Sequence, residues 1–236
     1  GNKKNFTKNN LKKISNSLRE EQKKYNLLLG GGDTTFSNKL SFTITSIGYS
    51  KKIIYRNQSN VNNDIYVTGN LGDSFIGLQI LKNKIKLNKS KTKYFINKYY
   101  MPDIQNKFSK NLLSLATSSM DISDGLITDL NKLINKQNVS YKIYEKFIPV
   151  SRNLNNLINS KNLNKIDLVS NGDDYQILFT AKPNNARIIN KLSKSLGVKI
   201  SKIGTILSGK NKSLILDQKG REIANNVSGY VHQFWS

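Results

Sequence analysis

Apolar side chains recur along this chain at two different spacings. Steps of three and four residues, typical of one buried helix face, begin with Leu11, Ile14 and Leu18 and return in later segments. These steps predict helices over residues 8–25, 75–81, 106–118, from about 123 to 134, and 184–196, with a polar helix and loop over 151–165. Alternation and short apolar runs predict strands over residues 25–29, 40–49, 64–69, 141–147, 176–180, 199–203 and 214–216, with a turn at Gly204.

Strands and helices therefore alternate along most of the chain, which is typical of the mixed α/β class. A length of 236 residues gives room for one large or two modest domains, each with its own core. A second block begins near Lys51, after the alternating segment, so we expect one domain in residues 1–50 and another in residues 51–236. No internal repeat is evident.

Composition removes several kinds of chemistry. The chain has no cysteine and a single histidine, His232, which excludes disulfides and thiolate metal sites and argues against a zinc site or a Ser-His-carboxylate triad. No apolar run is long enough to span a bilayer, and the first residues lack the apolar stretch of a signal peptide. We therefore expect a cytoplasmic protein without a membrane partner, whose chemistry rests on Asp, backbone amides and a few Arg or Lys.

The formal net charge of +23 raises the question of nucleic-acid binding. Only five of the 38 Lys and Arg residues are Arg, and the lysines are spread over nearly every predicted element. Base readout depends largely on Arg, and tracking of a phosphate backbone needs a concentrated basic stripe with stacking aromatics. Because neither pattern is present, we expect no nucleic-acid partner, and an anionic small substrate fits the same positive field.

Two aspartates stand three residues apart in Met120-Asp121-Ile122-Ser123-Asp124-Gly125-Leu126, directly before an apolar helical stripe. We expect both carboxylates to reach one hard cation, and the unpaired N–H groups of the first helical turn to face an anion. The alternative is ordinary helix capping, in which Ser and Asp satisfy the N–H groups and the dipole without any ligand. The pattern indicates a metal–nucleotide site and leaves the capping interpretation open.

Two further acidic turns carry glycine, namely Gly30-Gly31-Gly32-Asp33-Thr34-Thr35 and Asn171-Gly172-Asp173-Asp174. Consecutive glycines let a backbone approach a phosphate, and the oxygens that follow them suit magnesium, although a plain tight turn explains one such run equally well. Arg56 lies in a polar loop, where it either clamps a phosphate or is merely solvated. Three acidic turns in an α/β chain favour an enzyme that handles phosphates through magnesium over a binding module.

These segments occur in the order found in the thiamine-monophosphate kinase family, which the chain resembles over essentially its whole length. The matching blocks are Gly31-Gly32-Asp33-Thr34-Thr35, Ile65-Tyr66-Val67-Thr68-Gly69-Asn70-Leu71-Gly72-Asp73-Ser74 with Gly77-Leu78, Met120-Asp121-Ile122-Ser123-Asp124-Gly125-Leu126, and Gly172-Asp173-Asp174-Tyr175. Ile203-Gly204 and Gly229-Tyr230-Val231-His232 are similar to that family's C-terminal part. Four blocks in register are far more specific than any one of them.

The resemblance implies a kinase that moves the γ-phosphoryl group of ATP onto the phosphate of thiamine monophosphate, giving thiamine diphosphate. It also implies the two-domain ATP-binding fold of the aminoimidazole ribonucleotide synthetase-like superfamily, with a homodimer formed through the N-terminal domain and with ATP and several Mg²⁺ ions bound between the domains. Such a reaction depends on charge neutralisation and positioning, so it needs no His or Cys nucleophile.

The resemblance also assigns roles to individual residues. Asp33, Asp121 and Asp124 match metal-binding carboxylates of the family. Family positions that contact ATP correspond to Gly32, Asp33, Arg56 and Ser123. Family positions that contact the thiamine substrate correspond to Asp173 and Tyr230, with Phe234 and Trp235 as alternatives to Tyr230.

Some of the family's pattern is missing. Family members begin with about eighty further residues, which carry a Gly-Asp-Asp segment and another metal-binding Asp, so residues 1–50 resemble only the latter part of the first domain. Asn171 replaces a usual Gly, Gln176 replaces a usual Glu, and residues 102–105 replace a Pro-x-Pro-Arg segment. Two alternatives therefore stand beside the kinase: a catalytically silent fragment or scaffold, and a relative that phosphorylates another small anionic metabolite.

Overall fold

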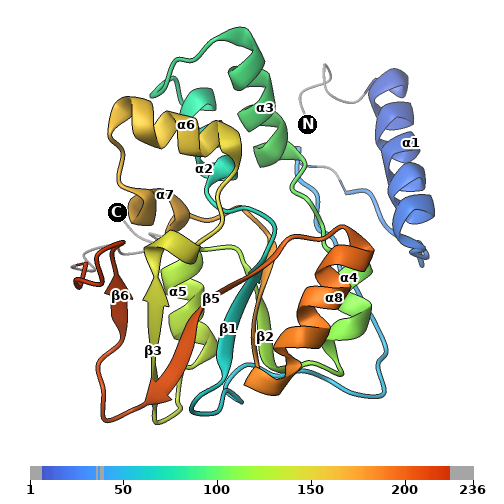
Figure 1. The fold of residues 1–236 in the computed structure, drawn as a ribbon. Helices are drawn as coiled ribbons and strands as arrows, with labels where there is room; N and C mark the ends of the chain where they lie inside the picture. The colour runs from blue at the N-terminus through green and yellow to red at the C-terminus, as the bar shows by residue number, and fades with distance from the viewer. Residues whose placement is uncertain (1–6, 36, 38–39, 224–236) are drawn as a thin grey trace. The chain divides into compact units, whose positions relative to one another are not determined.

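The computed structural model describes residues 7–35, 37 and 40–223, and its chain divides into two compact units at Lys51/Lys52. Within the first unit, α1 (Lys8–Tyr25) has the bounds that the sequence predicts (Figure 1). The Thr7 side chain accepts the N–H of Asn10 at 3.2 Å, and Asn26 ends the helix in the left-handed region with φ 54°. A hydroxyl N-cap and a left-handed Asn at the C-terminus explain these bounds.

The two strands predicted for the first unit are wrong. Residues 26–35 and 40–49 form no strand in the part of the chain that the structure describes. The apolar side chains of the second segment remain exposed, with 63 % of Phe42, 77 % of Ile44 and 98 % of Tyr49 accessible. Alternation leads to a stable strand only where neighbouring strands or a helix cover it, and the described residues of the first unit provide no strand to pair with this segment.

The second unit is built on one six-stranded sheet in the order β2-β4-β1-β5-β3-β6. Neighbouring strands are antiparallel except for the parallel pair β3 and β6. The strands are β1 (Asp64–Thr68), β2 (Ala116–Ile122), β3 (Val139–Tyr144), β4 (Gln176–Ala181), β5 (Ile200–Ser208) and β6 (Leu214–Leu216).

Helices cover both faces of this sheet, as the alternation along β1 shows. Ile65 and Val67 pack with α5 (Leu126–Leu133) in one core cluster. Tyr66 belongs to the opposite cluster, stacks on Phe179 with ring centroids 5.2 Å apart, and faces α4 (Asn106–Leu112) and α8 (Ala186–Leu196). All five residues of β1 are buried, so this strand is the centre of the unit.

A third group of helices lies beyond one end of the sheet (Figure 1). It contains α2 (Asp73–Leu81), α3 (Lys89–Tyr100), α6 (Arg152–Lys161) and α7 (Lys165–Val169), with a core of its own around Ile76, Phe95 and Leu154. Gly77 lets α2 and α3 pack closely, because a Cβ there would overlap the Phe95 carbonyl oxygen. The remaining elements are two short 3₁₀ turns, Glu145–Phe147 and Pro183–Asn185.

Several predicted bounds need correction. The helix predicted over 106–118 ends at Leu112, and the chain continues as β2, which pairs with β4 sixty residues later in the sequence. The helix predicted from about Ser123 begins at Leu126 instead, and α3 was not predicted. Gly204 is not a turn: it lies inside β5, where a Cβ would overlap the Lys142 carbonyl oxygen of β3.

Strand direction gathers five loops at one edge of the sheet. The strands β1, β2 and β3 end there and β4 and β5 begin there, because the first three are antiparallel to the other two. We call this the loop edge, formed by residues 69–72, 123–125, 145–149, 170–175 and 198–199. Along it, the loops of β2 and β4 lie to one side of β1 and those of β5 and β3 to the other.

Candidate functional site

The acidic turn 121–124 lies at the loop edge where β2 passes into α5. Asp121 is exposed near the end of β2, and Asp124 is partly buried in the turn that follows. Gly125 is required before the helix, because its φ is 110° and a Cβ would overlap the Ser170 carbonyl oxygen. The strand β2 thus brings two carboxylates to the loop edge, and their joint binding of one cation stays a prediction.

A buried carboxylate that the sequence analysis did not single out holds this turn in place. Asp129 on α5 is fully buried, and its Oδ2 accepts the N–H groups of Ser123 at 2.9 Å and Asp124 at 2.8 Å. Its Oδ1 is 2.9 Å from Lys132 Nζ, which also pairs with Asp124. The expectation of free N–H groups is therefore wrong for Ser123 and Asp124, whose N–H groups are used inside the protein.

The charges in this turn favour a protonated lysine. Burial lowers the pKa of Lys132, but hydrogen bonds and charge from Asp124 and Asp129 outweigh it, so the pKa is raised. Lys132 consequently stays positive and partly neutralises the two carboxylates beside it.

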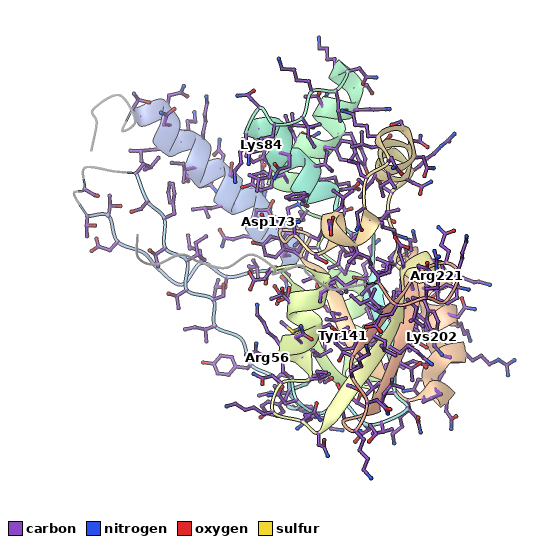
Figure 2. The ribbon with its side chains drawn as sticks, turned by 90° about the vertical axis from the view of Figure 1, so that its left-hand side faces the viewer. Arg56, Lys84, Tyr141, Asp173, Lys202 and Arg221 are labelled. Atoms are coloured by element: carbon purple, nitrogen blue, oxygen red, sulfur yellow. The ribbon has the colours of Figure 1, made fainter. Side chains whose placement is uncertain are left out.

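A second acidic loop, residues 171–175, packs directly on this turn. The Asp173 N–H donates to the Ser123 carbonyl at 2.9 Å, and the Tyr175 N–H donates to the Ile122 carbonyl at 2.8 Å. Gly172 has no room for a Cβ, which would overlap the Ser123 carbonyl oxygen. These contacts bring Asp173 beside the β2–α5 turn, as Figure 2 allows the reader to follow.

The carboxylates of the two loops influence the titration of Asp173 and Tyr175. Burial raises the pKa of Asp173, and the charge of Asp124 raises it further, while Lys82 opposes both. Burial also raises the pKa of Tyr175, with further contributions from Asp173, Asp121 and Asp124. Tyr175 is 42 % exposed and has φ 51°, and its backbone is held against the end of β2 by the bond to Ile122. Its place directly after two aspartates was the only sequence signal for it.

The fourth carboxylate, Asp174, points the other way and is structural. It is buried, and its Oδ2 accepts the Gly72 N–H at 2.7 Å at the start of α2. Burial raises the pKa of Asp174 to about 8, and nearby Asp73 adds to this effect. Asp73 is also buried and accepts hydrogen bonds from Tyr94 and Ser151, both at 2.7 Å.

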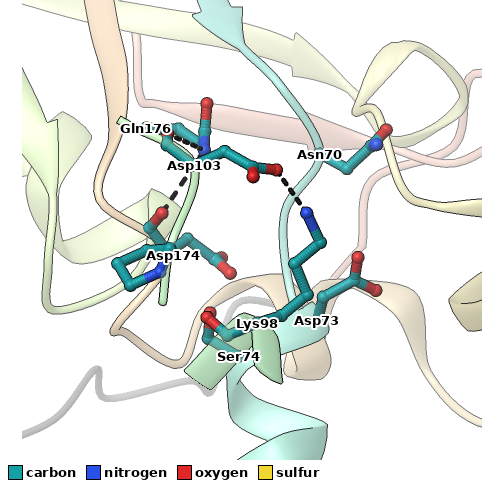
Figure 3. Close-up of a pocket in the computed structure, with 8 residues that line it drawn as sticks. Asn70, Asp73, Ser74, Lys98, Asp103, Asp174 and Gln176 are labelled. Atoms are coloured by element: carbon teal, nitrogen blue, oxygen red, sulfur yellow. Dashed lines mark hydrogen bonds and ion pairs between the residues drawn. The ribbon is translucent and has the colours of Figure 1, made fainter. Parts of the chain in front are cut away.

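Asp73 and Asp174 line a small polar cavity, shown in Figure 3. Lys98 forms an ion pair with Asp103 across it, and Gln176 donates to the Asp103 carbonyl at 3.1 Å. The cavity measures about 20 Å³, roughly the space of one water molecule. This volume is too small for a metabolite, so these polar groups hold the loops together.

Other residues that the sequence singled out lie apart from this cluster or outside the described part. Arg56 is exposed, and its neighbour Asn57 donates to the Leu133 carbonyl at 2.8 Å, at the C-terminal end of α5, whereas Asp124 precedes the N-terminal end of this helix. Figure 2 shows Arg56 apart from Asp173. Gly32 and Asp33 belong to the first unit. Tyr230, Phe234 and Trp235 lie outside the described residues.

The donor set at the loop edge suits magnesium in its chemistry. Asp121, Asp124 and Asp173 offer only carboxylate oxygens, the ligand type that Mg²⁺ prefers. Within residues 7–35, 37 and 40–223, no three acidic or histidine side chains are already arranged around one point that a metal ion would occupy.

Comparison with known proteins decides the family. Residues 60–217 match the family described as AIR synthase related protein, C-terminal domain. The chain is 34 % identical over 230 residues to the thiamine-monophosphate kinase of Buchnera aphidicola subsp. Schizaphis graminum, covering 94 % of this chain and 69 % of that protein. The chain belongs to the thiamine-monophosphate kinase family. Its relatives are named as thiamine-monophosphate kinases.

The same family is found among solved structures. The thiamine monophosphate kinase of Aquifex aeolicus aligns with a TM-score of 0.61 at 24 % identity, over 75 % of this chain and 56 % of that one. A structure described as AaThiL complexed with AMPPCP and TMP aligns with the same TM-score and identity, over 75 % of this chain and 53 % of that one. At this identity the likeness establishes the fold, which is the mixed α/β fold expected from the sequence.

The match does not extend over the full length of these relatives. The kinase of Haemophilus influenzae is 33 % identical over 205 residues, which is 86 % of this chain but 62 % of that protein. The chain thus spans about two thirds of its curated relatives and just over half of the solved structures. No helix in the described part of the chain has both the length and the apolar character that a membrane crossing requires.

Proposed function

We propose that this protein transfers the γ-phosphoryl group of ATP to the phosphate of thiamine monophosphate. In this reaction an oxygen of the acceptor phosphate bonds to the γ-phosphorus, the bond to the β-phosphate oxygen breaks, and ADP leaves with the electron pair. The observation that carries the proposal is the backbone pairing of the Asp173 loop with the turn that holds Asp121 and Asp124, in a chain of this family. The relative complexed with AMPPCP and TMP supports the same two ligands.

In this proposal, Asp121 and Asp124 hold Mg²⁺. The ion would supply neutralisation of the phosphate charge. Asp121 is exposed and has no ion-pair partner among the described residues, so its oxygens are available to a cation. Asp124 shares its charge with Lys132, and Asp129 fixes the backbone of the turn, so the two carboxylates keep their positions before any ligand arrives.

The remaining assignments follow from the family relationship. We propose that Ser123, Gly32 and Asp33 contact the phosphates of ATP, with Asp33 as a further metal ligand, and that Arg56 contacts the nucleotide as well. Asp173 and an aromatic residue near the C-terminus, Tyr230 with Phe234 and Trp235 as alternatives, would contact thiamine monophosphate. The backbone hydrogen bond between Asp173 and Ser123 supports a shared site, because it joins the residue proposed to contact thiamine monophosphate to a residue proposed to contact ATP.

Isothermal titration with a non-hydrolysable ATP analogue, with and without Mg²⁺, tests the nucleotide site. We expect Asp121→Asn to weaken Mg²⁺-dependent binding at least tenfold, about 1.4 kcal/mol, because one ionised ligand is lost. Asp167→Asn is the matched control: Asp167 is exposed on α7, and its loss changes the net charge equally. Equal weakening in both variants, or no weakening in Asp121→Asn, would remove Asp121 from the site.

The two alternatives have their own tests. A silent scaffold binds neither the analogue with Mg²⁺ nor thiamine monophosphate, whereas a kinase for another metabolite binds the nucleotide but gains nothing from thiamine monophosphate. We also propose that the protein forms a homodimer through its first unit. Sedimentation velocity of the full chain and of a chain that starts at Lys52 distinguishes this from a dimer held by the second unit.

A further inference from the structure

The loop edge is polarised, and its second half is as basic as its first half is acidic. On the β5 and β3 side of β1, a groove of about 600 Å³ is lined by the cations Lys146, Arg152, Lys165, Lys199 and Lys202. They come from four separate places: the turn after β3, the starts of α6 and α7, and β5 with the residue before it. Chain segments far apart in sequence therefore bring positive charge to one hollow.

Most of these cations lack an acidic partner. Lys202 pairs with Asp64 at 2.6 Å. Lys165 donates instead to the Glu145 carbonyl, and Lys199 to the Asn70 amide oxygen, both at 2.7 Å. These oxygens are neutral, so they satisfy hydrogen bonding without forming an ion pair with either lysine.

The other two cations have no carboxylate partner in the described part of the chain. Lys146 lies over the ring of Phe147, 4.9 Å from its centroid, and Arg152 is exposed at the start of α6. Four of the five cations in this groove thus form no ion pair among the residues that the structure describes.

The protein holds this charge at a cost. Burial lowers the pKa of Lys165, and the charge of Lys199 lowers it further against the opposing effect of Glu145. Burial likewise lowers the pKa of Lys199, which Asp73 partly offsets. A bound anion would remove this repulsion, because an opposite charge close by favours the charged form of lysine.

The groove also offers an apolar surface and a suitable size. Phe147 is 49 % exposed on its wall and meets Tyr144 edge-on, with ring centroids 5.7 Å apart. Its volume lies within the range of about 300–1,000 Å³ that is common for small-molecule sites. A long nucleic acid, by contrast, needs a basic track with several stacking rings, and among the described residues Phe147 is the one aromatic residue that lines this groove.

We propose that this groove, which we call the basic groove (Lys146, Phe147, Arg152, Lys165, Lys199 and Lys202), binds a small phosphorylated molecule without Mg²⁺. It is a different site from the acidic cluster, because β1 separates the strands that carry the two sites. The acidic cluster repels a bare phosphate and needs a metal ion to accept one, whereas the basic groove attracts it directly. The inference does not depend on the kinase activity.

Titration of the full chain with inorganic tripolyphosphate in the presence of EDTA tests the proposal. We expect saturable binding with one site per chain, and a loss of at least fivefold in affinity for Arg152→Gln and for Lys165→Gln. Lys84→Gln and Lys210→Gln remove the same charge at exposed positions outside the groove, and we expect them to change affinity by less than twofold. Thermal unfolding checks that Lys165→Gln still folds. Because Arg152 is exposed, we expect Arg152→Gln to fold normally, so it tests the groove even if Lys165→Gln does not fold.

Three results would overturn the proposal: no saturable binding, equal losses in the groove and control variants, or a loss in Asp121→Asn under EDTA. A single-stranded oligonucleotide serves as the competing probe. If it binds more tightly than tripolyphosphate and loses affinity in the same groove variants, the groove is a nucleic-acid site instead. The kinase proposal is tested separately, since Asp121→Asn should affect Mg²⁺-dependent nucleotide binding and leave tripolyphosphate binding unchanged.

Discussion

Asp174 Oδ2 accepts the backbone N–H of Gly72 at 2.7 Å, although the two residues are 102 positions apart in the sequence. The bond joins the loop before β4 to the loop after β1, and it turns Asp174 away from Asp173 and the acidic cluster. Two adjacent aspartates therefore have different tasks: Asp173 faces the candidate site, and Asp174 holds the loops on which that site is built.

The buried Asp174 should make stability depend on pH. Its pKa is about 8 in the folded protein against an ordinary 3.8, so between these values the folded chain keeps a proton that the unfolded chain has released. Stability should fall as pH rises through this window and level off above pH 8. Asp174→Asn carries no such proton, so its unfolding free energy should gain on the parent's from pH 5 to pH 8. Urea unfolding at a series of pH values measures this difference. A difference in unfolding free energy that stays constant from pH 5 to pH 8 would contradict the raised pKa of Asp174.

Removal of the Asp129 side chain should destabilise the acidic turn, because this carboxylate accepts two of its backbone N–H groups. Asp129→Ala leaves the N–H groups of Ser123 and Asp124 without an acceptor, and we expect a loss of about 1–3 kcal/mol in unfolding free energy. Asp129→Asn keeps an acceptor oxygen and should recover most of this loss. Denaturant unfolding measures both, with Asn131→Ala on the exposed side of α5 as the control. An alanine variant as stable as the control would mean that the turn does not depend on Asp129.

Gly172 should tolerate no side chain, because it touches the backbone of the other acidic turn. In Gly172→Ala the new Cβ overlaps the Ser123 carbonyl oxygen, so the loop must shift, at a cost of about 1–3 kcal/mol. The shift should also weaken Mg²⁺-dependent nucleotide binding. Gly197→Ala is the matched control, since its φ of 64° brings backbone strain but no atom lies within 4 Å of its Cβ. Gly172→Ala should bind the nucleotide more weakly than Gly197→Ala. Equal binding by the two variants would mean that the Gly172 loop is not part of the nucleotide site.

Arg56 offers a test of the family assignment that is independent of stability. Its side chain is exposed, so Arg56→Ala should change the unfolding free energy by less than about 0.5 kcal/mol. If the assignment is right, the apparent KM for ATP should rise about tenfold, as expected for the loss of one charge-assisted hydrogen bond, and more than the KM for thiamine monophosphate. Steady-state kinetics with Arg187→Ala, an exposed arginine on α8, provides the control. A larger effect on the acceptor would reject the assignment.

How well the sequence predicted each element depended on whether that element is determined locally. The bounds of α1 are set by neighbouring residues, the Thr7 cap and the left-handed Asn26, and the sequence predicted them correctly. β2 was predicted as the end of a helix, because its own residues alternate weakly and its partner β4 is far away in the sequence. The strand predicted over residues 40–49 was wrong for the opposite reason. Their alternation is clear, but no neighbouring strand pairs with them in the described part of the chain.

The candidate site divides in the same way. Asp121, Asp124 and Asp173 were visible as acidic turns beside glycine, and the structure brings them together. Asp129 was missed because it lies within an apolar stripe, one position before Leu130 and three after Leu126. A charged residue on the buried side of a helix was the signal available, since such a residue is rarely buried without a partner. The separate role of Asp174 follows from a contact with Gly72 that no local pattern reveals.

The order of strands in the sheet has a consequence for how this protein is made. Both neighbours of β1 are encoded far downstream, since Ile65 pairs with Thr180 on one side and with Gly204 on the other. During synthesis on the ribosome, β1 and β2 therefore cannot pair with their neighbouring strands until most of the chain has emerged. Until then their apolar residues are exposed to chaperones and to incorrect contacts. The loop edge, with both its acidic and its basic half, takes shape only in the last stage of synthesis.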